Sequence, residues 1–208
     1  TQILKGVVNM KGFFSLFSDS TKELKSVRTL TITGMMMALA LVLRHLAIQV
    51  TPDVRISFAF LPIIVIAMLY GPVVGAMSSV MVDFLGYIIS DAKIRDYSLL
   101  LASVQIIAGI IYGILLYRKE LEFIRIIFSR VAVVLICDMI LTSVIIYISY
   151  VNKDCSFRNV SHLQDFGIWL TPRLTKSLLQ LPFDLILSCI VVPSAIQAYK
   201  RVAKHYIG

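Results

Sequence analysis

Basic and aromatic side chains stand close together where long apolar stretches begin or end. Arg55 precedes Phe58 and Phe60, and Arg173 follows Trp169. Guanidinium groups hold carboxylates and aromatic rings stack on flat ligands, so these pairings suit an anionic aromatic ligand. Taken one at a time, such residues more often anchor a protein among lipid headgroups. As a cluster they predict a binding site that contains Arg44, Arg55, Phe58, Phe60, Asp83, Tyr97, Gln105, Trp169, Arg173 and Lys176.

Three carboxylates, Asp83, Asp138 and Asp184, lie within apolar stretches. An ionisable group is costly in lipid and is expected to face the interior of a helix bundle, where it finds a partner. Such acids can recognise a ligand, relay protons or hydrogen-bond neighbouring helices. Both kinds of role stay open for Asp83. A structural role is favoured for Asp138 and Asp184, because no basic residue is expected at their depth.

The sequence lacks the motifs of the common enzyme classes. It contains no GxxxxGK phosphate-binding loop and no HExxH zinc motif. The three histidines do not predict a Ser–His–Asp set at one depth in the membrane. Cys137 and Cys189 lie in apolar stretches without metal-ligand spacing, which is typical of small core residues. We therefore expect no catalytic residue, no metal and no cofactor, and ATP hydrolysis would have to come from another protein.

The composition is typical of a membrane protein. Apolar residues make up 58% of the 208 residues and charged residues 15%, whereas soluble domains carry about 25% charge. This hydrophobicity excludes a disordered chain, and the long apolar stretches argue against an outer-membrane barrel, whose strands alternate. Basic cytoplasmic loops explain the net charge of +8 better than a nucleic-acid partner does.

The apolar stretches predict an all-α membrane protein with a bundle of six transmembrane helices. Gly71 and Pro72 divide one long stretch into two helices. An even number of spans puts both termini on one side, and the excess of basic residues on that side favours cytoplasmic termini. The predicted organisation is a basic interfacial leader at 1–28, a membrane domain at 29–200 and a cytoplasmic tail at 201–208. The predicted helices lie at about 29–50, 56–70, 73–90, 97–117, 131–151 and 171–199.

Two shorter patterns concern helix ends and helix contacts. In the leader, Ser20 and Glu23 match a capping box, which would start the first membrane helix before residue 29. Small residues also recur four positions apart, and such pairs let helices approach closely, either inside the bundle or against a partner. These pairs are Gly34 with Ala38, Gly71 with Gly75, and Gly109 with Gly113.

Several segments resemble a known family. Residues 55–62 (RISFAFLP), 69–72 (LYGP) and 83–86 (DFLG) are similar to segments of the substrate-binding S components of energy-coupling factor (ECF) vitamin transporters. Residues 171–176 (TPRLTK), followed by a Leu-Pro pair, resemble the folate-specific branch of that family. The resemblance extends in order and in number of spans over about residues 34–193.

This resemblance implies a high-affinity vitamin-binding subunit of an ECF-type ABC importer in the plasma membrane of a prokaryote. Such a subunit binds its vitamin, here most similar to folate, from the outside. It delivers the vitamin by toppling on a transmembrane scaffold subunit that works with two cytoplasmic ATPases. Small residues of the first helix dock on the scaffold, and Gly34 and Ala38 match that position. Three alternatives stay open: another vitamin such as pantothenate, a proton-coupled carrier, or an intramembrane enzyme that uses Asp83, Asp138 and Asp184.

Overall fold

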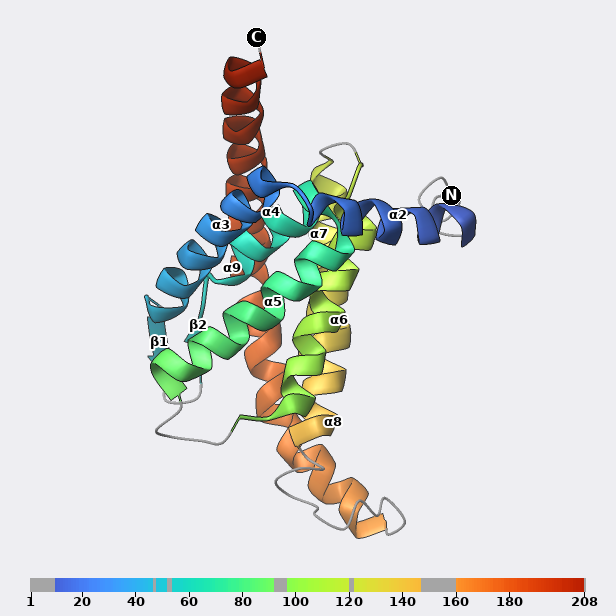
Figure 1. Cartoon of the computed structure of the whole chain (residues 1–208). Coiled ribbons are helices and arrows are strands. Elements are labelled where there is room, and N and C mark those ends of the chain that lie inside the picture. Colours follow the sequence, from blue (N-terminus) through green and yellow to red (C-terminus); the bar gives the residue numbers. More distant parts are fainter. Residues whose placement is uncertain are drawn as a thin grey trace.

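A computed structural model of the protein describes residues 10–46, 48–51, 54–91, 97–119, 122–146 and 160–207. Apart from one short hairpin, the elements in these ranges are helical (Figure 1). The π-helical segment η1 (Tyr87–Asp91) continues α5, and η2 (Val134–Leu141) joins α7 to α8. The α-helices are α2 (Met10–Glu23), α3 (Val27–His45), α4 (Phe60–Tyr70), α5 (Pro72–Gly86), α6 (Leu99–Leu116), α7 (Phe123–Val133), α8 (Thr142–Ile146) and α9 (Val160–Ile207).

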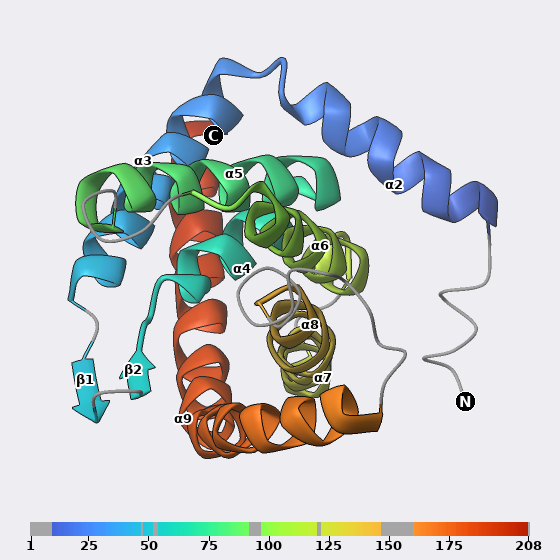
Figure 2. The same cartoon turned by 90° about the horizontal axis from the view of Figure 1, so that it is seen from below.

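The expected helical membrane protein is confirmed, but the expected number of spans is not. Among the described residues, four helical segments are long and apolar enough to cross a membrane: Val27–His45, Pro72–Ile89, Leu99–Leu116 and Ser177–Tyr199. The same residues form seven continuous helical stretches, because α7, η2 and α8 run on into one another. The stretch beyond the six predicted ones is α2, which lies across one end of the bundle (Figures 1 and 2).

The prediction of a first helix at 29–50 was wrong at its C-terminal end. Helix α3 ends at His45, and strands β1 (Ile48–Thr51) and β2 (Val54–Ile56) follow as an antiparallel pair. Three of the four residues of β1 are β-branched and favour a pleated strand. The sequence then continues with Pro52, which cannot donate a helical hydrogen bond. We call this side of the bundle the hairpin end and the opposite side the α2 end.

The predicted second helix, at 56–70, also begins too early. Helix α4 starts at Phe60 and has 11 residues, so it rises only about 16 Å against a hydrocarbon core of about 30 Å. It ends as expected at Gly71, whose φ of 90° suits a residue without a side chain, and Pro72 opens α5. Figure 2 shows α4 at the centre of the bundle, and most of its side chains are buried.

The last two predicted helices are longer than their apolar stretches. The helix predicted at 131–151 begins at Phe123, eight residues earlier, so Arg125 and Arg130 lie within it. The helix predicted at 171–199 extends over Val160–Ile207, a length of 48 residues. In both cases polar and basic residues continue the helix beyond the apolar stretch from which it was predicted. Amphipathic turns of this kind carry too little hydrophobicity to be recognised as a span.

Helices α5 and α6 pack closely because glycine and alanine line their contact. A methyl group added at Gly109 would lie 2.7 Å from the backbone of Ala76, and one added at Gly113 would overlap the backbone of Pro72. A methyl group at Gly75 would lie 2.8 Å from the Ala67 side chain on α4. The pairs Gly71 with Gly75 and Gly109 with Gly113 therefore serve packing inside the bundle. Gly34 differs, because nothing lies within 4 Å of a methyl group added there.

Ser20 does not cap its own helix, so the capping-box prediction was wrong. It lies in the last turn of α2 and is fully buried against the α4–α5 turn. Its hydroxyl donates to the Tyr70 carbonyl at 2.7 Å and accepts from the amides of Val73 and Val74 at 3.1 and 3.3 Å. These amides are among the first of α5, which have no partner within their own helix. A side chain from α2 therefore caps α5 and fixes α2 to the bundle.

We predict that Gly113→Ala destabilises the protein, whereas the matched control Gly34→Ala does not. The new methyl group at position 113 would force apart α5 and α6, and overpacking of this kind costs about 1–3 kcal/mol. Position 34 is open and helical, so alanine there is expected to be neutral or stabilising by up to ~1 kcal/mol. Thermal unfolding of the purified protein in detergent measures both effects. Equal melting temperatures for the two variants would contradict the close α5–α6 contact.

Candidate functional site

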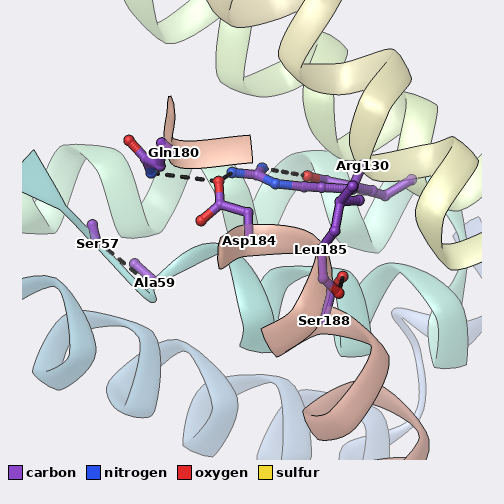
Figure 3. Close-up of polar contacts among 8 residues, drawn as sticks. Ser57, Ala59, Arg130, Gln180, Asp184, Leu185 and Ser188 are labelled. Carbon is purple, nitrogen blue, oxygen red and sulfur yellow. Dashed lines mark hydrogen bonds and ion pairs between the residues drawn. The ribbon is translucent and has the colours of Figure 1, made fainter. Parts of the chain in front are cut away.

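A buried ion pair joins α7 to α9. The Arg130 Nη2 donates to the Asp184 Oδ2 at 2.5 Å, and the Arg130 Nη1 donates to the Tyr112 hydroxyl of α6 at 2.8 Å (Figure 3). The side chains of the two charged residues are 7% and 3% exposed. Gln180, one turn before Asp184 on α9, donates a longer hydrogen bond of 3.4 Å to the same carboxylate oxygen.

The ring of Phe60 completes the surroundings of the guanidinium. Its centroid lies 3.9 Å from the Arg130 Cζ, which is the distance of a stacked cation–π contact. Phe60 is the first residue of α4, so side chains from α4, α6, α7 and α9 meet at this point. We call Phe60, Tyr112, Arg130, Gln180 and Asp184 the arginine–aspartate cluster.

The cluster is incompletely hydrogen-bonded within the described part of the chain. The Asp184 Oδ1 and the Arg130 Nε are both buried and have no hydrogen-bond partner there. A charged group taken out of water needs several good contacts to compensate the lost hydration. One acceptor and one donor therefore remain for a further molecule or for a rearrangement of the pair.

The predicted helices at 97–117 and 131–151 leave Arg130 in the loop between them, and no basic residue was expected near Asp184. Both expectations were wrong. Arg130 is buried on α7, and its partner on α9 is 54 positions away in sequence. One signal was present in the sequence. An isolated acid in an apolar helix requires a cation, and Arg130 directly precedes the apolar run that starts at Val131. Asp138, the third intramembrane acid, is exposed on η2.

A second polar cluster lies at the hairpin end. The Arg44 Nη1 of α3 donates to the Asp83 Oδ1 of α5 at 3.2 Å. Burial raises the pKa of Tyr97 above its usual value, and the negative charge of the nearby Asp83 carboxylate raises it further, while Arg44 lowers it. The Tyr97 ring also packs against Phe84 and Tyr87, with ring centroids 5.4 and 5.1 Å away. Three of the predicted site residues, Arg44, Asp83 and Tyr97, are thus brought together.

The other predicted site residues divide into two groups. Phe58 and Phe60 pack against the main hydrophobic core, and Gln105 is partly buried on α6. Arg55 lies on β2, and Trp169, Arg173 and Lys176 lie on α9. The side chains of these four residues lie outside the described part of the structure. Within that part, no three His, Cys, Asp or Glu side chains gather into a group that could hold a metal ion.

The sequence of residues 28–192 matches the family model of the ECF transporter substrate-specific component. The chain belongs to this family. The S component is 25% identical over 158 residues to the folate transporter FolT of Clostridium novyi (strain NT), a match that covers 70% of this chain and 90% of that protein. Its fold resembles a crystal structure of FolT bound with folic acid, with a TM-score of 0.64 at 24% sequence identity. That match covers 81% of this chain and 94% of the FolT chain.

Membership in the family makes the chain a substrate-specific subunit of a transporter and not an enzyme in its own right. It also agrees with the absence of nucleotide-binding motifs from the sequence. The S component is a multi-pass membrane protein, in agreement with its apolar helices.

We predict that the arginine–aspartate cluster is stable only as a pair. Arg130→Met leaves Asp184 as an uncompensated buried charge, which costs about 3–5 kcal/mol. Adding Asp184→Leu removes that charge, and an apolar pair of similar volume is often neutral or stabilising. The double variant is therefore expected to melt near the wild-type temperature and the single variant well below it. A single variant as stable as the wild type would show that the ion pair does not hold α7 against α9.

Proposed function

We propose that this S component binds folate from outside the cell and belongs to an ECF-type importer. The observation that carries the proposal is the match along 90% of the length of a folate transporter. The fold shared with folate-bound FolT supports it. Folate also suits the residues of this chain, because it combines a flat pterin and a benzoate ring with two carboxylates.

The proposed ligand contacts fall into two classes. Phe58, Phe60, Tyr97 and Trp169 offer rings, while Arg55, Arg173 and Lys176 offer cations for the carboxylates, with Gln105 as a further polar group. Arg44 and Asp83 already neutralise each other, so we assign to this pair the task of holding α3 against α5 beside the ligand. Phe60 packs on the Arg130 guanidinium, which places a ring beside a fixed cation.

The intramembrane acids support binding over the alternatives of a proton-coupled carrier or an enzyme. Asp83 and Asp184 both form ion pairs with arginine. A carboxylate held in this way is suited to fixing helices or a ligand, whereas a proton relay needs a group that exchanges its partner readily. Pantothenate lacks aromatic rings and makes less use of the phenylalanine and tyrosine side chains at the hairpin end.

Delivery is proposed to require a scaffold subunit and two cytoplasmic ATPases, with the S component toppling on the scaffold. In this arrangement six helices cross the plasma membrane of a prokaryote and the α2 end faces the cytoplasm. Helix α3 is suited to docking, since only 17% of its span is buried in the bundle, against 39% for α5 and for α6. Its outward face has small residues at Gly34 and Ala38. These are flanked by the exposed apolar side chains of Leu30, Met35, Leu39 and Val42.

We predict that the purified protein binds folate without ATP, an ion gradient or a partner protein. Isothermal titration in detergent should give a saturable signal with folate and none with pantothenate or thiamin. Mass spectrometry of small molecules released from the purified protein provides an independent check. Saturable binding of pantothenate in place of folate would overturn the substrate assignment while leaving the family assignment intact.

We predict that Gly34→Leu combined with Ala38→Leu separates binding from transport. Two leucines on the outward face of α3 would prevent close backbone contact with a scaffold helix, and such contact is the main source of attraction between helices in lipid. Position 34 is open in the isolated subunit, so the variant should fold and bind folate normally. Uptake into cells and co-purification of the scaffold should both fail.

A matched control replaces another pair of small residues one helical turn apart. Ser194 and Ala198 are exposed on α9, and the Ser194 hydroxyl donates to the Ile190 carbonyl of the same helix at 2.7 Å. Ser194→Leu with Ala198→Leu should leave uptake unchanged. If the α3 variant transports as well as this control, the docking face lies elsewhere on the protein.

A further inference from the structure

We propose that the arginine–aspartate cluster recognises the edge of a flat heterocyclic ligand that carries an N–H donor beside a carbonyl acceptor. The proposal rests on the proposed folate-binding function and names the part of the ligand that the cluster contacts. The sequence analysis had favoured a structural role for Asp184 and had included Asp83 among the residues of the predicted binding site. The geometry reverses these two assignments.

The position of the cluster is the first observation. Because α4 rises only about 16 Å, its first residue, Phe60, lies well inside the thickness of the bundle. The chain that arrives from β2 passes through Ser57 and Ala59 before reaching it. Figure 3 shows this segment and Gln180 on the Asp184 side of the ion pair. The cluster therefore lies inside the bundle beside the N-terminal end of α4, which is the end of that helix nearer the hairpin.

The unused hydrogen-bonding atoms are the second observation. Asp184 is 2% exposed and its Oδ2 holds Arg130 and Gln180, but its Oδ1 has no partner among the described residues. The Nε of Arg130 is likewise buried and unused there. Buried polar atoms are nearly always hydrogen-bonded in native proteins. The Asp184 Oδ1 and the Arg130 Nε belong to the same ion pair, so a single group of a ligand could bind to both atoms.

The chemistry of these atoms defines the ligand. A carboxylate oxygen accepts from an amino or ring N–H group, and a guanidinium Nε–H donates to a carbonyl oxygen. The 2-amino-4-oxo edge of a pterin presents these groups side by side on a flat ring. Phe60, which packs on the guanidinium, offers an aromatic face next to that edge. Asp83 is less suited, since its carboxylate already pairs with Arg44 and lies beside Tyr97.

The structural alternative is that a small rotation joins Nε to Oδ1 and closes the ion pair with two hydrogen bonds. The cluster would then fix the four helices and ignore the ligand. The double variant Arg130→Met with Asp184→Leu separates the two roles, because it removes every charged atom of the cluster without leaving a buried charge behind.

The experiment measures folate affinity by titration for the wild type, the double variant and Asp19→Asn. The last is a control for the loss of a paired carboxylate, because Asp19 on α2 pairs with Arg118 at the α2 end, away from the cluster. Loss of a hydrogen bond to a charged group weakens binding by about 10- to 150-fold. The double variant should lose at least this much while keeping the wild-type melting temperature, and Asp19→Asn should bind like the wild type.

A folate analogue with hydrogen in place of the 2-amino group tests the assigned edge. The wild type should discriminate against this analogue by about 10-fold or more, and the double variant should bind both compounds equally. If the double variant does not fold, Arg130→Lys serves instead. It keeps the positive charge beside Asp184 but lacks the Nε–H donor, so folate affinity should fall while the melting temperature stays within a few degrees.

The outcomes distinguish this inference from the function on which it rests. Wild-type folate affinity in a folded double variant, or in Arg130→Lys when that variant replaces it, would overturn the inference and leave folate binding intact. Equal affinity of the wild type for folate and for the 2-deamino analogue would overturn the assigned edge. Absence of folate binding by the wild type would overturn the proposed function and this inference with it.

Discussion

The ion pair between Arg130 and Asp184 is the contact on which the arrangement of the central helices depends. Together with Tyr112 and Phe60 it takes one side chain from each of α4, α6, α7 and α9. A single residue turns an α-helix by about 100°, so a shift of one position in any of the four would carry its side chain out of reach. A buried charge without its partner is costly. The four helices are therefore specified as a set, with one shared register.

The two ends of the bundle are built on different principles. At the α2 end, small residues bring α5 and α6 into backbone contact, and the Ser20 hydroxyl joins α2 to the start of α5. Packing there leaves little freedom for side chains to rearrange. At the hairpin end α4 is missing, and the contacts are made by a charged pair and aromatic rings that include Arg44, Asp83 and Tyr97. The closely packed α2 end thus supports a hairpin end that is lined with polar and aromatic groups.

The sequence was sufficient for the class of protein and for most of its helices, but not for its central contact. The apolar stretches located α3, α5 and α6 to within a few residues at most ends, and the break at Gly71 was correct because Gly-Pro acts locally. The hairpin was missed because a short β-branched run at the end of an apolar stretch also reads as membrane helix. Arg130 was misplaced because pairing with Asp184 joins residues far apart in sequence. The hydrophobic periodicity of the sequence does not indicate such a pair. Only the requirement that a buried acid has a cationic partner indicated that Asp184 needed one.

The length of α9 has a mechanical consequence. Its 48 residues would measure about 72 Å if straight, more than twice the hydrocarbon thickness of a bilayer. Such a helix has to emerge from the membrane on at least one side, and Figure 1 shows its C-terminal end projecting beyond the other helices. Its ends therefore lie farther from the centre of the molecule than those of its neighbours. If the subunit topples as proposed, the same angle of tilt would move the C-terminal tip of α9 through a longer arc than the ends of the neighbouring helices.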